Sequence, residues 1–337
     1  MQVTPSLCYF FPIEGDAVTF KVAIGQINPK LGDLQSNLAL YEEKIRRGVK
    51  EKADLLLFPE LSLTGYFLRD MVPNVALKLS APEIKELKKL SREVSFVAGL
   101  VEESSDYRFY NAAVYFEDGE IRHVHRKVYL PTYGMFDEQR YFARGDRVRA
   151  FDSKFGRFAV LICEDLWHPS TVYLAALDGA VAILCPSASP FRGITDQQVQ
   201  DDNARYWELI NRAYAETFGL FITFGNRVGF EDGVGFWGGS ELLDPAGRRI
   251  AKGKYYDEDF IVGEVALESV RRKRTMAPLL RDEDLDLTIN ELMRIRERPF
   301  QTRKDQGTSA SSVEPLKGSR VRGKKGKRRK AKGKKKR

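Results

Sequence analysis

Short, strongly apolar runs alternate with segments of helical periodicity through most of this chain, and this alternation restricts the folds open to it. The runs are rich in β-branched residues and predict strands buried on both faces. They read FKVAIGQI (20–27), DLLLFPE (54–60), SFVAGL (95–100), GRFAVLIC (156–163), AVAILCPS (180–187) and GLFITFGNRV (219–228). Helical spacing between the runs, as in 38–49 and 197–217, predicts a layered α/β fold. A hairpin turned at Asp118 and Gly119 favours mixed rather than all-parallel sheets.

Charge is distributed unevenly along the 337 residues and separates a body from a tail. Residues 301–337 contain 16 Lys/Arg and 2 Asp/Glu, a net charge of +14, whereas residues 1–300 carry a net charge of −6. We expect four regions: an N-terminal arm (1–19), a globular domain that carries the predicted strands and helices (20–270), a C-terminal extension (271–300) and a Lys/Arg-rich tail (301–337). The tail cannot bury a core and is predicted to be disordered. Its residues 317–337 can bind nucleic acid or acidic proteins nonspecifically, or stay solvated without a partner.

Three further features concern the location of the protein. No apolar run reaches the length of about 18 residues that a membrane-spanning helix needs. The first residues, MQVTPSLCYFFPIEGD, lack the basic region and cleavage site of a secretory signal and predict an added strand or arm. The three cysteines (Cys8, Cys163 and Cys185) are too few for a disulfide framework and indicate a reducing compartment. Together these features predict a cytoplasmic protein that does not enter a membrane.

Three of the predicted strands end in a chemically useful side chain. LLLFPE ends at Glu60, HVHRKVYLP carries Lys127, and AVLIC ends at Cys163. The carboxyl ends of strands in open α/β sheets face the crevice where ligands bind, so these side chains can meet there. Each has an ordinary explanation by itself, as a turn glutamate, a solvent-facing lysine or an inert buried cysteine. Their joint occurrence favours an active site.

The cysteine needs activation from elsewhere in the chain. Glu164 and Asp165 follow Cys163 directly, and their charges raise the pKa of a neighbouring thiol. An ordinary thiol is already little ionised at neutral pH. Glu60 can take the proton of the thiol, and Lys127 can stabilise the oxyanion that forms when sulfur attacks a carbonyl carbon. This chemistry requires no metal or cofactor, and the three histidines lack metal-binding spacing and are predicted to pack or lie at the surface.

Three segments together resemble the signature segments of the nitrilase, or carbon–nitrogen hydrolase, superfamily. They are LLLFPELSLTGY, HRKVYLPTYGMFDEQRYF and VLICEDLWHP, and they occur in the order found in that superfamily. Their flanking residues look most like the glutaminase domain of glutamine-dependent NAD synthetase. The resemblance implies a four-layer αββα sandwich with mixed β-sheets, which commonly pairs into a homodimer or larger oligomer. It also implies a triad of Glu60 as general base, Lys127 beside the oxyanion and Cys163 as nucleophile, with Glu138 as a second glutamate that orients the substrate.

The same resemblance implies a substrate pocket. The residue at the place of Glu164 helps to bind the α-amino group of glutamine in such glutaminase domains, and aromatic residues matching Tyr66, Tyr133 and Phe136 line the pocket. Further partners for the amino and carboxylate ends of an amino acid are expected in the loop PSASPFRG, namely Ser189 and Arg192.

The resemblance to NAD synthetase does not extend to an ATP-binding synthetase domain, because the chain turns polar at RRKRTMAPLLRDEDLDL. The sequence therefore predicts a thiol amidohydrolase that cleaves a small amide, with a glutamine-like ω-amide favoured, through a cysteinyl thioester and with release of ammonia. The enzyme would act alone or supply ammonia to a partner. One alternative is a related hydrolase of an N-carbamoyl amine, aliphatic amide or nitrile. The other is a non-catalytic scaffold that binds polyanions through the basic tail.

Overall fold

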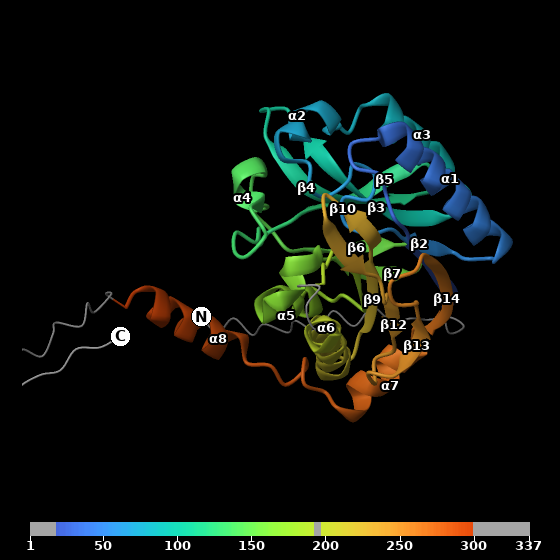
Figure 1. Ribbon diagram of the computed structural model, residues 1–337. Coiled ribbons are helices and arrows are strands. Elements are labelled where there is room, and N and C mark those ends of the chain that lie inside the picture. The colour runs from blue at the N-terminus through green and yellow to red at the C-terminus, as the bar shows by residue number, and fades with distance from the viewer. Residues whose placement is uncertain (1–17, 192–196, 299–337) are drawn as a thin grey trace, which may run out of the picture. The chain divides into compact units, whose positions relative to one another are not determined.

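The structure is a computed structural model that describes residues 18–191 and 197–298 and divides the chain into two units, Met1–Glu283 and Asp284–Arg337 (Figure 1). The described part of the first unit contains two six-stranded sheets. The first sheet has the order β14–β1–β2–β3–β4–β5 and consists of β1 (Thr19–Gln26), β2 (Leu55–Leu57), β3 (Ser95–Glu103), β4 (Phe109–Glu117), β5 (Glu120–Arg126) and β14 (Asp259–Ala266). The second has the order β13–β12–β9–β8–β7–β6 and consists of β6 (Ala150–Ser153), β7 (Gly156–Val160), β8 (Ala182–Ser187), β9 (Phe221–Asn226), β12 (Glu241–Leu243) and β13 (Arg249–Lys252).

Both sheets are mixed, as the sequence predicts. Strands β1, β2 and β3 pair in parallel at the centre of the first sheet; β14 pairs antiparallel with β1, β4 with β3, and β5 with β4. The second sheet repeats the scheme, with β7, β8 and β9 parallel and with β6, β12 and β13 antiparallel. Parallel central strands bring their carboxyl ends to one edge of each sheet, which is where functional side chains gather in such folds.

Strand β2 shows why its apolar run is continuous. Leu55 and Leu57 pack into a core formed with residues of β7, β8 and β9, so one face of β2 meets the other sheet. Leu56 and Phe58 pack on the opposite face with Tyr41 of α1 (Leu34–Lys50) and with α3 (Pro82–Leu90). A strand covered on both faces needs apolar residues at every position.

Helices cover the outer face of each sheet. Helices α1 and α3 cover the first sheet, and α5 (Pro169–Leu177) and α6 (Gln197–Phe218) place Val172 and Trp207 in the core of the second. Figure 1 shows these two helix pairs next to different sheets. The first unit is therefore a helix–sheet–sheet–helix sandwich, and the predicted αββα architecture is confirmed.

Two hairpins of the first unit turn at Gly-containing dipeptides. Asp118 (φ +52°) and Gly119 (φ +82°) connect β4 to β5, and their left-handed backbone is that of the two-residue turn expected from an Asp-Gly sequence. The glycine-rich segment 228–239 forms a second hairpin, in which β10 (Val228–Glu231) pairs with β11 (Val234–Trp237) across Asp232 and Gly233. This small hairpin contributes to the site described below.

The remaining elements are short or lie towards the C-terminal end of the chain. They are η1 (Arg69–Met71), α2 (Val72–Val75), α4 (Glu138–Tyr141), η2 (Cys163–Trp167), α7 (Glu268–Met276) and, in the second unit, α8 (Leu285–Arg296). Helix α7 crosses residue 270, where the sequence places the end of the domain. Asp284 caps α8 by accepting a hydrogen bond from the Leu287 backbone N–H. None of the helices within 18–191 and 197–298 is long and apolar enough to cross a membrane.

We predict that Gly99→Ala destabilises the fold and displaces Glu60. A Cβ atom at Gly99 of β3 would lie 2.4 Å from the Pro59 carbonyl oxygen and 2.5 Å from the Leu61 nitrogen, so the backbone on both sides of Glu60 would have to move. Overpacking of this kind costs about 1–3 kcal/mol and would lower the urea midpoint of unfolding. Gly134→Ala is the control, because a Cβ there meets nothing within 4 Å and only its φ of +60° carries a cost. An unchanged midpoint for Gly99→Ala would contradict the tight approach of β3 to the backbone around Glu60.

Candidate active site

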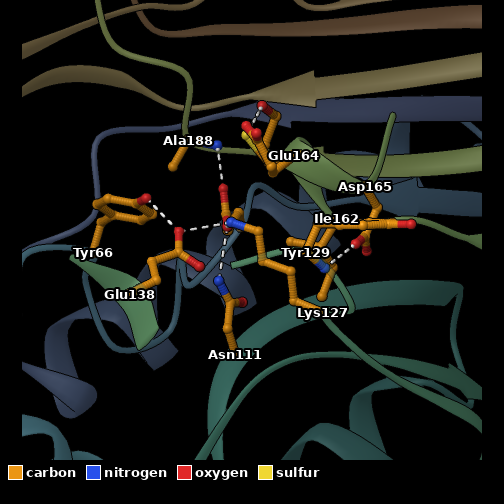
Figure 2. Close-up of polar contacts among 12 residues, drawn as sticks. Tyr66, Asn111, Lys127, Tyr129, Glu138, Ile162, Glu164, Asp165 and Ala188 are labelled. Carbon is orange, nitrogen blue, oxygen red and sulfur yellow. Dashed lines mark hydrogen bonds and ion pairs between the residues drawn. The ribbon is translucent and has the colours of Figure 1, made fainter. Parts of the chain in front are cut away.

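Side chains from both sheets converge beyond the ends of their strands (Figure 2). Glu60 follows β2, Lys127 follows β5 directly, Glu138 begins α4, and Cys163 begins η2 just after β7. The sequence singled out these four residues from widely separated segments, and hydrogen bonds join three of them directly.

Lys127 occupies the centre of the cluster. Its side chain is completely buried, and Nζ donates hydrogen bonds of 2.7 Å to both Glu60 Oε1 and Glu138 Oε1. Burial alone lowers the pKa of Lys127, but the two carboxylates raise it well above its ordinary value. Lys127 is therefore a permanent cation held between two acids, and the third N–H of its ammonium group is not used by either of them.

Three hydrogen-bond donors contact the carboxylate of Glu60 and use most of its acceptor positions. Oε1 accepts from Lys127 Nζ and from Asn111 Nδ2 at 2.8 Å, and Oε2 accepts from the Ala188 backbone N–H at 2.8 Å. Figure 2 shows Asn111 and Ala188 approaching from opposite directions. Because a carboxylate oxygen accepts about two hydrogen bonds, the remaining position is on Oε2. Sequence patterns missed both partners, since Asn111 lies inside a strand and Ala188 acts through its backbone.

Glu138 is the second acid on Lys127 and has a different environment. Its Oε1 also accepts from Tyr66 Oη at 2.5 Å, whereas its buried Oε2 has no hydrogen-bond partner among the described residues. Burial raises the pKa of Glu138 to about 7, with Lys127 acting to lower it and Glu60 to raise it. Glu60 and Glu138 therefore differ in hydrogen bonding although they share one cation.

Cys163 stands on a strained turn. Its φ of +41° is a left-handed conformation that costs a non-glycine residue energy, and residues strained in this way cluster at active sites. The thiol is buried, and Sγ accepts a hydrogen bond of 3.2 Å from Ser187 Oγ at the end of β8. Burial, followed by the charge of Glu60, raises the pKa of Cys163 well above its ordinary value, against the opposing effects of Lys127 and Ser187. The resting group is a thiol, so its proton must be taken up during attack.

Asp165 connects the segment that follows Lys127 to the turn that carries Cys163. It is fully buried, and its Oδ1 accepts from the backbone N–H groups of Val128 (3.0 Å) and Tyr129 (2.9 Å). Its Oδ2 accepts from the Ile162 N–H (3.0 Å) and lies 2.8 Å from His125 Nε2. The second acid after the cysteine is therefore a structural anchor between two sheets, a role that the sequence did not reveal.

The other two histidines pack against aromatic rings. His123 stacks on Phe151 with ring centroids 4.3 Å apart, and burial lowers its pKa to about 4. His168 stacks on Tyr129 at 3.4 Å. These contacts agree with the expectation that the histidines are packing residues.

Glu164, the residue after Cys163, contacts Tyr133. Tyr133 Oη lies within hydrogen-bond distance of both of its carboxylate oxygens, at 2.9 Å and 3.1 Å, and Tyr133 also contacts Phe136 edge to face. Glu164 is partly buried, and desolvation raises its pKa. The structure thus brings together three of the predicted pocket residues, beside the turn that carries Cys163.

Ser189 and Arg192 are the two predicted pocket residues of the loop PSASPFRG. Ser189 Oγ is buried and accepts hydrogen bonds from three side chains, those of Asn203 (3.2 Å), Trp207 (2.9 Å) and Trp237 (3.2 Å). Its hydroxyl is thereby engaged in packing α6 and β11 rather than joined to the other predicted pocket residues. Arg192 lies outside the described residues.

The small hairpin supplies a buried ion pair that the sequence did not predict. Arg227 Nη1 donates to Glu231 Oε2 at 2.6 Å, and both side chains are almost completely buried. Glu231 Oε1 accepts from the backbone N–H groups of Tyr66 (2.8 Å) and Phe67 (2.7 Å). The hairpin therefore fixes the loop whose tyrosine reaches Glu138. The sequence signal was an Arg directly before the glycine-rich segment and a Glu four residues later within it.

A cavity of about 480 Å³ borders the Glu138 side of the cluster. Tyr66, Phe136 and Glu138 line it together with Asp232 and Val234 of the hairpin. Its lining combines aromatic and aliphatic side chains with charged groups, as in many small-molecule sites.

An αββα sandwich that gathers an acid, a lysine and a cysteine at its strand ends defines a class of hydrolases acting on carbon–nitrogen bonds. The family profile of the carbon–nitrogen hydrolases matches residues 21–275. The chain belongs to that family.

The chain is similar to enzymes of two kinds. The chain is 34% identical over 265 residues to a glutamine-dependent NAD(+) synthetase of Thermotoga maritima. The aligned region covers 77% of this chain but only 44% of that relative. It is 26% identical over 270 residues to an N-carbamoylputrescine amidase of Arabidopsis thaliana, covering 76% of this chain and 89% of that relative. Among solved structures, a carbon–nitrogen hydrolase from Helicobacter pylori G27 is 26% identical with a TM-score of 0.74, covering 82% of this chain and 99% of the other.

Glu138 should make the stability of the protein depend on pH in a way that Glu138→Gln removes. Its pKa rises from an ordinary 4.5 to about 7 on folding, so between these values the folded state holds a proton that the unfolded state has lost. The stabilisation is fully present below pH 4.5 and is lost as the pH rises through 7. We expect the wild type to lose free energy of unfolding relative to Glu138→Gln across this range in urea titrations. A difference that stays constant with pH would contradict a protonated Glu138.

Proposed function

We propose that this protein is a thiol amidohydrolase that cleaves the C–N bond of a small amide through a cysteinyl thioester and releases ammonia. The observation that carries the proposal is the buried Glu60–Lys127–Glu138 cluster next to Cys163 on its strained turn. Burying this much charge is costly, and perturbed ionisable groups of this kind concentrate at functional sites.

In the proposed reaction, Glu60 takes the proton of Cys163 as sulfur bonds to the amide carbon and the carbonyl electron pair moves onto oxygen. The one open acceptor position of Glu60, on Oε2, suits this role. The third N–H of Lys127 and the backbone N–H that follows Cys163 stabilise the oxyanion.

The intermediate then collapses as its C–N bond breaks, and the proton passes from Glu60 to nitrogen, so that ammonia leaves and a thioester remains. A water molecule that gives a proton to Glu60 attacks the thioester carbon. The carboxylic acid leaves as the C–S bond breaks, and sulfur recovers the proton.

Glu164 supports a substrate that carries an amine. Its partly buried carboxylate lies beside Tyr133 and next to the nucleophile, where it can pair with an ammonium group of the substrate. A glutamine-like ω-amide fits this arrangement, in line with the similarity to the glutamine-dependent NAD(+) synthetase.

An N-carbamoyl amine is the second candidate substrate. It also combines a cleavable C–N bond with a distant amine, and the similarity to the N-carbamoylputrescine amidase extends over 89% of that relative rather than over half of it. The two candidates differ in the α-carboxylate, which only the amino acid carries. The scaffold hypothesis rests on residues 301–337, which lie outside the described residues.

Ammonia release from four compounds would test the proposal: L-glutamine, N-carbamoylputrescine, propionamide and propionitrile. We expect L-glutamine to be the best substrate and Cys163→Ala to lower the rate at least about a thousandfold, because the nucleophile is removed. Glu164→Gln should raise KM for the two amine-bearing compounds and leave propionamide unaffected. Cys185→Ala is the matched control, since it removes the other buried cysteine of the described residues.

Equal rates for wild type and Cys163→Ala would refute the proposed chemistry. A clear preference for N-carbamoylputrescine would retain the chemistry and replace glutamine by the second candidate.

A further inference from the structure

The end of strand β8 touches both partners of the proposed proton transfer. Ser187 is its last residue, is completely buried, and donates through Oγ to Cys163 Sγ at 3.2 Å. The next residue, Ala188, donates its backbone N–H to Glu60 Oε2 at 2.8 Å. One short stretch of backbone therefore sets the position of the thiol relative to the acid that receives its proton.

Ser187 supplies a donor that the lysine does not replace. Lys127 lowers the pKa of the thiol through its charge, but its Nζ donates to the carboxylates of Glu60 and Glu138 at 2.7 Å, whereas Ser187 donates to the sulfur itself. A hydroxyl that donates to an anion forms a charge-assisted bond, which is about twice as strong as one to a neutral acceptor. The bond from Ser187 therefore strengthens as negative charge develops on sulfur.

The sulfur also needs to be held in one orientation. Cys163 has a left-handed backbone (φ +41°) and begins η2 just after β7. Ser187 lies on the neighbouring parallel strand of the same sheet, where its own backbone is fixed by pairing with β9 and its carbonyl accepts from Arg227 N at 3.0 Å. It is a rigid point from which to hold the thiol.

We propose that Ser187 is a positioning residue that orients the Cys163 thiol towards Glu60 and stabilises the thiolate as it forms. The inference rests on the proposed function in taking Cys163 as the nucleophile. Ser187 acts through Cys163 and needs no contact with the substrate.

Alkylation of Cys163 tests this role without any amide turnover. The rate of carboxamidomethylation by iodoacetamide is measured between pH 6 and 10 for wild type and Ser187→Ala, with the Cys163 peptide quantified by mass spectrometry. We expect the rate profile of Ser187→Ala to move about one pH unit to the alkaline side, which makes alkylation roughly tenfold slower at pH 7. The value of kcat for the best amide should fall as well, with little change in KM.

Ser240→Ala is the matched control. Ser240 is also a completely buried serine, and its hydroxyl bonds to the backbone of Asn226 rather than to sulfur. Its removal should lower stability without moving the alkylation profile. Superimposable profiles for Ser187→Ala and wild type would overturn the proposal. If instead the profile shifts but Cys163→Ala still releases ammonia, the Ser187–Cys163 coupling stands and the proposed function fails.

Discussion

The burial of the Lys127 charge is the constraint on which the rest of the site depends. An ammonium group without exposure to water costs several kcal/mol unless it is paired, and removing one partner of a buried pair costs about 3–5 kcal/mol. Both Glu60 and Glu138 are therefore needed at 2.7 Å, and they arrive from segments 78 residues apart in the sequence. Asn111 and Tyr66 then bond the oxygens of these acids. Satisfying one cation fixes the geometry of most of the cluster.

The two sheets are joined at this point by backbone donors as well as by side chains. The N–H of Ala188 reaches across from the second sheet to Glu60, and Asp165 accepts backbone N–H groups from the segments after β5 and β7. Such bonds depend on where a strand ends more than on which residue is present. They explain how a site assembled from separate loops keeps the thiol and the acid in register, which preorganised catalysis requires.

Local patterns predicted the strands, a layered α/β fold and the candidates Glu60, Lys127 and Cys163, whereas the αββα layers and Glu138 followed from the resemblance to a family. Apolar runs mark buried strands, and Glu60 and Cys163 end such runs, whereas Lys127 follows the more polar strand β5. Asn111, Ser187 and Glu231 carry no such signal, since each looks like an ordinary strand or hairpin residue until the sheets pack. Ser189 stays a prediction, and its hydroxyl accepts hydrogen bonds from two tryptophans and an asparagine that its sequence context did not indicate. The contacts of these residues form only when the sheets pack, so they could not be predicted from spacing in the sequence.

The most direct test of the proposed chemistry is the mass of the protein during turnover. Wild-type enzyme mixed with L-glutamine and quenched in acid within milliseconds should carry the acyl group of the substrate, which is glutamine less ammonia, on the peptide that contains Cys163. The adduct should form at the same rate as an initial burst of ammonia and decay as product acid appears. Turnover that proceeds with unmodified Cys163 at every quench time, together with an adduct elsewhere or none, would contradict a cysteinyl thioester.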